Sequence, residues 1–360
     1  MKTIGIISLC NIYVLPYAKT YVNAIIENEN HCDLIYWDRD AVDGKNDGLN
    51  DCTKHSFQYK LTERSSRIDK LLGYIKATNY IKDTIKENNY DGLIFLQTHA
   101  AVFCNSILQE KYKGKYIIDI RDYTLENIKI FYNTECKAIA SAYSTVISSP
   151  AYKNFLPNGD FVVAHNYTPF LSEKVEEIRG NRKHDGPINI SFIGTIRFLE
   201  MDKKILRRFA NDTRFSINYF GRGAEILENF CEENNISNVK FHGSFIPEQT
   251  LEFYKQTDMI NNLYGNHNRF LDDALSNKLY HSGQLHIPIL VCPETYMEEV
   301  SIKYHMGFVF DVENINDPNK LFNWYNSLDF AKLDKGCDEF IQRVVKDNEM
   351  FYQMCKKFCK

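Results

Sequence analysis

The chain has 360 residues, which is enough for two domains of ordinary size. Hydrophobic residues make up 44% of it and charged residues 25%, a balance typical of a globular protein in water. The formal net charge is −4, which excludes the overall cationic field of a nucleic-acid-binding protein, so no nucleic-acid partner is expected.

The ten cysteines are scattered and form no C-x-x-C pair. Such spacing is typical of a reduced, cytoplasmic protein with buried thiols and argues against structural zinc. The apolar run at residues 4–10 is too short for the core of a signal peptide and fits a first β-strand. Since no window of about 18 apolar residues occurs, the sequence predicts no membrane span.

Short apolar runs alternate with helical patterns through the first half of the chain. The predicted strands are Thr3–Leu9, Asp33–Trp37, Gly92–Gln97, Lys115–Asp119, Thr145–Ser148 and Phe161–Ala164, and the predicted helices are Tyr17–Glu29, Ser66–Asn88 and Ala101–Lys111. Residues 39–58 are polar and rich in Asp, Asn and Gly, which indicates a loop. The alternation predicts a doubly wound sheet with parallel strands.

Residues 169–187 interrupt this alternation. A charged helix is predicted over Leu171–Ile178, and the polar stretch after it is typical of a domain linker. A second series of predicted strands follows at Ile188–Ile193, Phe215–Phe220, Val239–His242, Met259–Leu263, Ile287–Cys292 and Gly307–Phe310. The sequence therefore predicts an α/β protein built from two successive Rossmann-like halves.

Ligands of open α/β sheets bind at the carboxyl ends of the strands, so the residues after each strand are the candidates for chemistry. The first strand of the second half ends at Gly194-Thr195, with Arg197 next and Lys203 in the helix that follows. A glycine turn before a helix favours a bound phosphate, because free N–H groups and the helix dipole both attract an anion. We expect Arg197 to add a forked contact and Lys203 or Lys204 a point charge. A turn that only faces solvent is the alternative.

The segment Ser276–Val291 reads S-N-K-L-Y-H-S-G-Q-L-H-I-P-I-L-V. It resembles the donor-site signature of retaining GT-B glycosyltransferases, which is N-K-L-Y-E, a short helix and then G-x-P-V-I. Four further stretches also fit that family, namely Ile193-Gly194-Thr195, Gly221-Arg222-Gly223, Val239-x-Phe241-x-Gly243 and Tyr254-x-x-x-Asp258. The resemblance is strongest over about residues 188–312, and in the first half it rests on Asp119–Asp122, Ser148–Pro150 and His165-Asn166. It points to transferases of bacterial capsule and exopolysaccharide assembly, of the glycosyltransferase group 1 or family 4 type.

This resemblance implies the GT-B fold, in which two Rossmann-like domains face each other across a cleft. It predicts an acceptor-binding domain over 1–168, a linker over 169–187 and a nucleotide-sugar-binding domain over 188–335. A helical tail over 336–360 is expected to pack back towards the first domain.

The resemblance also assigns residues to the donor. Its diphosphate is expected at Gly194 and Thr195, with Arg197 and Lys203 as catalytic cations that neutralise the leaving group. The other residues expected in the donor site are Gly221, Arg222, Asn277, Lys278 and Leu279.

The family's E-x7-E pair falls on Asp273 and His281. Its second member normally binds the ribose hydroxyls, and an imidazole at that place can still hydrogen-bond a hydroxyl. A plain surface histidine is the alternative for His281. Asp273 is expected to touch the donor sugar, and spacing leaves its neighbour Asp272 open.

In the first half, His99 and Asp122 follow predicted strands and are candidates for the acceptor side or for catalysis, as the resemblance implies. Alternatively, Arg121 pairs internally with Asp119 or Asp122, and His99 is a structural histidine. The D-x-D sequence at residues 38–40 is interpreted as part of a loop. Because Arg197 and Lys203 are expected to neutralise the leaving diphosphate as a divalent metal does elsewhere, neither a metal nor another cofactor is expected.

Residues 60–82 carry a local net charge of +4 around the apolar residues Leu71, Leu72 and Ile75. A basic amphipathic stretch of this kind can lie on anionic lipid at the inner face of the cell membrane. A helix that turns these apolar residues to the core is the alternative.

The sequence and the resemblance together predict a metal-independent, retaining glycosyltransferase. It would move a sugar from a nucleotide-sugar donor to a lipid-linked glycan acceptor in surface polysaccharide synthesis. Two alternatives stay open: a nucleotide-sugar epimerase of the same architecture, and a non-catalytic subunit that binds sugar nucleotides for another transferase.

Overall fold

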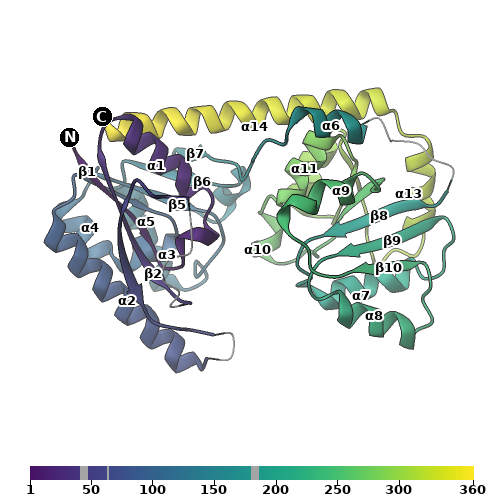
Figure 1. Cartoon of the computed structure of the whole chain (residues 1–360), viewed down its shortest axis with the longest axis horizontal. Coiled ribbons are helices and arrows are strands. Elements are labelled where there is room, and N and C mark those ends of the chain that lie inside the picture. The colour runs from purple at the N-terminus through teal and green to yellow at the C-terminus, as the bar shows by residue number, and fades with distance from the viewer. Residues whose placement is uncertain (41–47, 63–64, 180–185) are drawn as a thin grey trace. The chain divides into compact units, whose positions relative to one another are not determined.

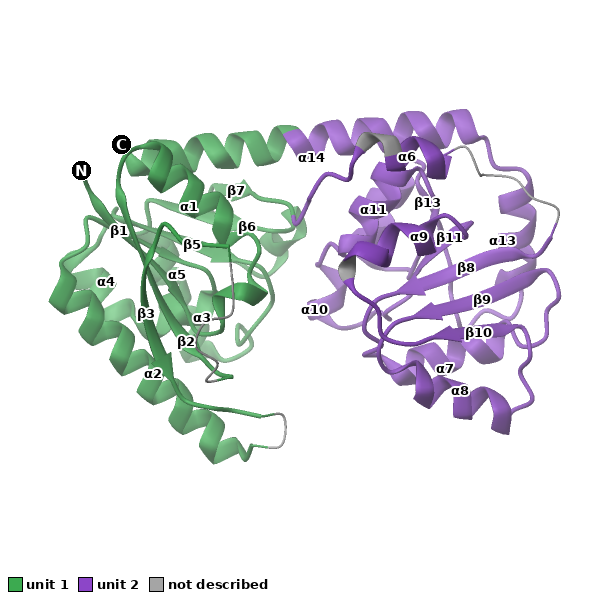
Figure 2. Ribbon diagram, in the orientation of Figure 1, with its two compact units in different colours: residues 1–165, 346–360 green, residues 166–345 purple. Residues whose placement is uncertain are grey.

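The computed structural model describes residues 1–40, 48–62, 65–179 and 186–360. These residues form two compact units, one of Met1–His165 with Lys346–Lys360 and one of Asn166–Val345 (Figure 2). Parts of the predicted loop (41–47), of the basic stretch (63–64) and of the linker (180–185) lie outside the described residues. Each unit has its own parallel sheet flanked by helices, so the predicted pair of Rossmann-like domains is confirmed.

The first unit contains a seven-stranded parallel sheet of order β3-β2-β1-β4-β5-β6-β7 (Figure 1). Its strands are β1 (Thr3–Ser8), β2 (His31–Asp38), β3 (Thr53–Gln58), β4 (Gly92–Phe95), β5 (Tyr116–Ile120), β6 (Ser144–Ile147) and β7 (Phe161–Val163). Its helices are α1 (Ala18–Glu27), α2 (Arg67–Asn88), α3 (Thr98–Phe103), α4 (Asn105–Lys111) and α5 (Lys129–Ala140). The strand order reverses between β1 and β4, where the loops at the carboxyl ends diverge.

Three features of this unit differ from the sequence prediction. β3 lies inside the segment predicted as a loop. The strand was missed because, as an edge strand paired with β2, its residues Thr-Lys-His-Ser-Phe-Gln show no apolar pattern. Helix α5 was not predicted. The helix predicted over Ala101–Lys111 is two helices, α3 and α4, which meet at Cys104.

One long helix, α14 (Phe330–Cys359), contributes to both units. Its last turns place Phe351, Cys355 and Cys359 in a buried cluster with residues of β1, β2 and α1. The side chain of Asn30 also donates a hydrogen bond to the carbonyl of Cys359, 2.7 Å away. The predicted tail over 336–360 is therefore part of a helix that begins earlier. Among the described helices, this one included, none is both long and apolar enough to cross a bilayer.

The second unit contains a six-stranded parallel sheet of order β10-β9-β8-β11-β12-β13. Its strands are β8 (Ile188–Ile193), β9 (Phe215–Phe220), β10 (Val239–His242), β11 (Met259–Asn262), β12 (Ile289–Val291) and β13 (Gly307–Val309). Its other helices are α6 (Ser172–Arg179), α7 (Leu199–Arg208), α8 (Ala224–Glu233), α9 (Thr250–Tyr254), α10 (Arg269–Asp272), α11 (Asn277–Leu285), α12 (Tyr296–Lys303) and α13 (Asp317–Asn326). The strand order reverses between β8 and β11, which makes the carboxyl ends of these strands the expected ligand edge.

Two apolar layers cover this sheet. One is formed with α7, α8 and α13, and the other with α6, α9, α11, α12 and the first half of α14 (Figure 1). Val175 and Ile178 of α6 are buried in the second layer. The helical part of the segment predicted as a linker thus packs into the core of this unit.

A polar cluster around the buried His286 links α6, α11 and α14. His286 ends α11 in the left-handed conformation, with φ 55°. Its Nδ1 lies 2.9 Å from Asp334 and its Nε2 lies 3.0 Å from Asp338, both on α14. Arg179 of α6 donates to the Gln284 carbonyl at 3.1 Å and lies 2.6 Å from His286 Nε2.

The buried carboxyl group of Glu135 in α5 makes the stability of the fold depend on pH. Its side chain is buried, and neither carboxylate oxygen has a hydrogen-bond partner within the described part of the chain. Burial, together with the charge of Glu126, raises the pKa of Glu135 to about 8. The unfolded carboxyl titrates near 4.5. The folded state is therefore destabilised as the pH rises from the unfolded pKa to the folded one.

We expect Glu135→Gln to unfold with a flatter pH dependence between pH 5 and 9 than the wild type, because an amide does not ionise. The variant should be more stable by about 2 kcal/mol or more at the alkaline end. At pH 4, below the unfolded pKa, the two proteins should be nearly equal. Urea unfolding at several pH values measures this, and parallel pH profiles would contradict the assignment.

Candidate functional site

Two glycine turns meet at the carboxyl ends of β8 and β9. Gly194 and Gly221 both have left-handed backbone angles, with φ 143° and 141°. The turns are joined by hydrogen bonds from Gly194 N to Phe220 O, at 2.9 Å, and from Ile196 N to Arg222 O, at 3.1 Å. A Cβ atom on Gly221 would lie 1.9 Å from the Gly194 carbonyl oxygen. Only glycine fits at residue 221, and the turns present bare backbone at this edge.

Lys278 brings a buried ammonium group to these turns. It lies in the first turn of α11, where its backbone N–H donates to the Ser276 cap at 3.2 Å. Its side chain is 6% exposed, and Nζ donates to the Tyr264 hydroxyl at 2.5 Å and lies 4.1 Å from the centre of the Phe192 ring. A Cβ atom built on Gly194 would be 3.7 Å from this Nζ. The cation is therefore held against the Gly194 turn.

A buried carboxyl group, Asp202 of α7, belongs to the same neighbourhood. It accepts a hydrogen bond from the Tyr219 hydroxyl at 3.1 Å. Burial raises the pKa of Asp202 to about 7, against the smaller opposing effects of Tyr219 and Lys278. Near neutral pH this carboxyl is only partly ionised and only partly balances the Lys278 charge.

The other predicted cations, Arg197 and Lys203, are not buried against the glycine turns as Lys278 is. Arg197 and Thr195 are exposed in the turn that follows β8. Lys203 instead pairs with Glu200, 2.9 Å away on the same helix, and its Nζ lies 5.8 Å from the centre of the Phe230 ring. The structure thus places Lys278, and not Lys203, at the glycine turns. The i,i+3 spacing on α7 favours the pair with Glu200.

His281 faces the interior of its own unit. Its Nδ1 lies 2.9 Å from the Tyr254 hydroxyl, and its ring packs on Phe170 with the centroids 5.0 Å apart. Burial, and to a smaller degree the charge of Lys278, lowers the pKa of His281 to about 4, so the ring is neutral at pH 7. In the tautomer in which Nδ1 accepts the Tyr254 proton, Nε2 carries the ring's own proton and is a donor.

The remaining donor-site candidates differ in how far they are buried. Asp273 is buried at the end of α10, with one carboxylate oxygen 3.7 Å from Arg269. Its neighbour Asp272 has a buried oxygen that lacks a hydrogen-bond partner among the described residues, and burial raises its pKa. Asn277 and Arg222 are exposed. Leu279 is wholly buried in the core beneath α11, so its side chain cannot line a ligand site.

In the first unit, Arg121 forms an internal ion pair. Its Nε and Nη2 donate to the two carboxylate oxygens of Asp119 at 2.6 and 2.8 Å. Its Nη1 also donates to the Ala164 carbonyl at 2.8 Å, and the guanidinium lies over the Tyr17 ring. The alternative in which Arg121 holds the turn is therefore the one that forms, with Asp119 as its partner. Asp122 is exposed at the same carboxyl edge.

His99 lies in an aromatic pocket at the amino end of α3. Its ring centroid is 5.8 Å from that of Tyr74 and 6.1 Å from that of Phe103. Neither ring nitrogen has a hydrogen-bond partner in the described part of the chain, and burial lowers the pKa of His99 to about 4, with a smaller effect from Arg39. His99 is a neutral, largely buried ring in this structure.

Two groups at strand ends were missed by the sequence analysis. Arg39 was assigned to a loop, but its guanidinium stacks over Trp37 at 4.5 Å and donates to the Leu9 carbonyl at 2.6 Å. His242, at the end of β10, is exposed and stacks on Phe220 with ring centroids 4.2 Å apart. The available signal for both was an aromatic residue at the carboxyl end of a strand, Trp37 in β2 and Phe220 in β9.

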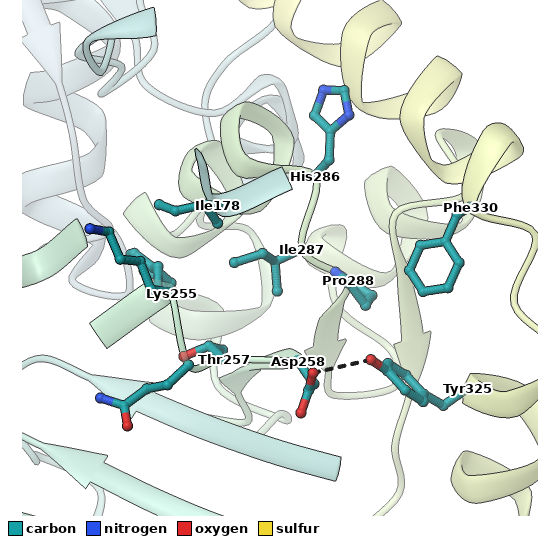
Figure 3. A pocket seen from close by; sticks show the side chains of 11 residues that line it. Ile178, Lys255, Thr257, Asp258, His286, Ile287, Pro288, Tyr325 and Phe330 are labelled. Carbon is teal, nitrogen blue, oxygen red and sulfur yellow. Dashed lines mark hydrogen bonds between the residues drawn. The ribbon is translucent and has the colours of Figure 1, made fainter. Parts of the chain in front are cut away.

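A small cavity lies at the opposite edge of the second sheet. Its lining includes Thr257, Asp258 and Pro288, which precede β11 and β12, and Tyr325, whose hydroxyl donates to Asp258 at 3.4 Å (Figure 3). The cavity encloses about 40 Å³, space for one or two water molecules. It is too small for a nucleotide and lies away from the glycine turns. No cluster of three metal-ligating side chains occurs over the described ranges.

Comparison with known proteins identifies the fold. No family model and no curated protein matches the chain. Among solved structures, sucrose-phosphate synthase from Thermosynechococcus elongatus superposes with a TM-score of 0.70 at 11% identity, covering 99% of both chains. Anabaena HepE in complex with UDP gives 0.69 at 11% identity over 99% of this chain and 100% of its own. The lipopolysaccharide outer core galactosyltransferase WaaB gives 0.68 at 14% identity over 98% and 99%. At these identities the likeness shows the fold, and the predicted GT-B fold is confirmed.

The contact between the two turns can be tested with matched glycine variants. We expect Gly221→Ala to lower the free energy of unfolding of the second unit by about 3 kcal/mol or more, because its new carbon must displace backbone. Gly243, which follows the next strand, has open space around its Cβ position. Gly243→Ala should therefore change stability by no more than about 0.5 kcal/mol. Chemical denaturation measures both changes in the free energy of unfolding. Equal changes would mean that the two turns can move apart at little cost in free energy.

Proposed function

We propose that this protein is a glycosyltransferase that moves a sugar from a nucleotide-sugar donor to a glycan acceptor. The observation that carries the proposal is the buried Lys278 ammonium held against the Gly194 and Gly221 turns. A buried cation beside bare backbone, at the switch point of a parallel sheet, suits a diphosphate. The GT-B fold, which the chain shares with a lipopolysaccharide galactosyltransferase and with HepE solved in complex with UDP, supports the same proposal.

The donor we propose is a uridine diphosphate sugar. The solved structures of HepE are complexes with UDP, with UDP and glucose, and with UDP-glucose. In this chain the diphosphate would lie at the Gly194 turn, between Lys278 and the exposed Arg197. Asp272 and Asp273, which follow β11 at the same edge, would face the sugar, and His281 would donate from Nε2 to a ribose hydroxyl.

The chemistry asked of these residues is electrostatic. As the bond between the anomeric carbon and the phosphate oxygen breaks, negative charge grows on the diphosphate. Lys278 is already desolvated and fixed by Tyr264 and Phe192, so it can stabilise this charge without reorganising. Arg197 would add a forked contact from the solvent side. We propose retention at the anomeric carbon on the strength of the family resemblance.

For the acceptor we propose a lipid-linked glycan of surface polysaccharide assembly. His99 and Asp122 lie at the carboxyl edge of the first sheet, where an acceptor would be bound. Asp122 is exposed there, whereas His99 is buried and would need a local opening to reach a hydroxyl.

The lysine that serves the donor can be identified by substitution. We expect Lys278→Met to reduce kcat by roughly a hundredfold or more, the usual order for the loss of one preorganised charge. Arg197→Ala should have an effect of the same order, and Arg197→Lys should recover only part of it. The kcat of Lys203→Met, by contrast, should stay within about threefold of the wild-type value, because Lys203 forms an ion pair with Glu200.

The donor is first identified by a thermal-shift screen of UDP-, GDP-, CDP- and dTDP-sugars, and kinetics then follow with that donor. Melting curves of each variant separate a kinetic loss from unfolding. Full activity of Lys278→Met together with loss in Lys203→Met would reverse the assignment of the two lysines. Donor turnover without an acceptor, giving the epimeric sugar nucleotide, would identify an epimerase. Binding without transfer or hydrolysis would identify a non-catalytic subunit.

We expect activity to survive EDTA, because Lys278 and Arg197 neutralise the leaving diphosphate in the way that a divalent ion does in other transferases. Transfer rates measured before and after chelation, with donor at saturation, test this. Complete loss that manganese restores would show that these cations do not suffice.

A further inference from the structure

The first two turns of α2 carry apolar side chains on the side that faces away from the core. Ile68, Leu71, Leu72 and Ile75 are 71%, 61%, 42% and 49% exposed. We call these four residues the α2 stripe. The sequence alternative, in which this side of the helix faces the core, is therefore wrong.

The core is contacted by a different face of the same helix. Gly73, Ala77, Ile81 and Ile85 are buried, and a Cβ atom on Gly73 would lie 2.7 Å from the Trp37 ring. At about 100° per residue, the stripe occupies an arc centred roughly opposite these residues. The helix already buries a complete inner face, so the stripe is not needed to hold it on the sheet.

Basic side chains lie near the stripe. At about 100° per residue, Arg67 and Lys76 flank it on its two sides, and Lys60 and Lys70 are further exposed basic residues of the same segment. Asp69, an acidic residue among the described ones, completes the capping box of α2 with Ser66. The whole chain has a net charge of −4, so this positive cluster is a local feature on a negative protein.

We propose that the α2 stripe docks the protein on an anionic lipid surface. Its four apolar side chains would enter the interface below the headgroups, while the flanking lysine and arginine side chains extend to the lipid phosphates. Each such charge raises the partition onto an anionic surface by about fivefold. An anionic lipid surface would bury the apolar side chains and pair the basic ones with phosphate groups at the same time.

Two other occupants, a different protein and a second copy of this chain, fit the stripe less well. A stable interface with another protein buries about 1,000 Å² or more, and a stripe of two turns, about 12 Å long, is too small to supply that area. A second copy of this chain, paired symmetrically through the stripe, would bring two clusters of like charge together. The charge pattern therefore favours a surface of phosphate groups.

The position of the stripe also fits a membrane-bound acceptor. Helix α2 follows β3, so its first turns lie at the carboxyl edge of the first sheet. Further exposed apolar residues, Leu125, Ile128 and Ile130, follow β5 at that edge. Docking through α2 would hold the proposed acceptor edge next to the lipid.

The test uses the full chain and sedimentation with vesicles of phosphatidylcholine, with or without phosphatidylglycerol. We expect binding to the anionic vesicles that falls as salt is raised. Ile68→Ser with Leu71→Ser should weaken this binding by roughly tenfold or more. Arg67→Gln with Lys76→Gln should weaken it by roughly twentyfold on anionic vesicles and leave the weak binding to neutral ones unchanged.

The matched control is Ile226→Ser with Ile315→Ser, which removes two isoleucines of the second unit that are 47% and 75% exposed. This control should bind like the wild type, and circular dichroism should show all variants folded, since every substituted side chain is exposed. Absence of binding to anionic vesicles, or equal binding by the stripe variant, would overturn the proposal. So would a wild-type dimer that the stripe variant dissociates. The assay contains no sugar nucleotide, so its result is independent of the proposed function.

Discussion

The second unit depends on a backbone contact that leaves no room for a side chain. Gly221 lies against the carbonyl of Gly194, and both residues hold left-handed angles that other residues rarely adopt. This contact sets the paths by which the chain leaves β8 and β9. It thereby fixes the bare backbone beside which Lys278 is held. The position of the candidate site follows from two glycines more than from any charged residue.

The site gathers groups that are neutral, or nearly so, around one buried cation. His281 is uncharged at pH 7 because burial lowers its pKa, and Asp202 is partly protonated because burial raises its own. Lys278 is left with a tyrosine hydroxyl and aromatic faces as its nearest described contacts. A buried ammonium without a full counter-charge is costly unless a ligand supplies one. An incoming diphosphate would supply it.

Much of the fold could be predicted because its strands are short apolar runs that stand out from helical patterns. The sheet of the second unit was predicted strand by strand, and the strand predicted over Thr3–Leu9 forms β1. β3 was missed because an edge strand need not be apolar. α5 was missed because its apolar residues do not share one face: Ile130 is 81% exposed, whereas the charged Glu135 is buried. The surroundings of the site residues could not be predicted in the same way. The sequence and the resemblance suggested both Lys203 and Lys278 for the donor site, but neither shows that Lys203 lies beside Glu200 whereas Lys278 is buried against the Gly194 turn. The resemblance likewise made Leu279 a candidate, although its side chain belongs to the core.

Helix α14 makes the first unit discontinuous along the chain. Its core is sealed by Phe351, Cys355 and Cys359, which are translated only after the whole second unit. During synthesis, the first unit therefore leaves the ribosome with the part of its core that α14 covers still open, although α1 packs on the same cluster, and that part stays open while the second unit is made. The order of translation is thus not the order in which the cores are completed, and the second unit can finish before the first. A chaperone that shields exposed apolar surface would bind this protein at its amino-terminal half during that interval.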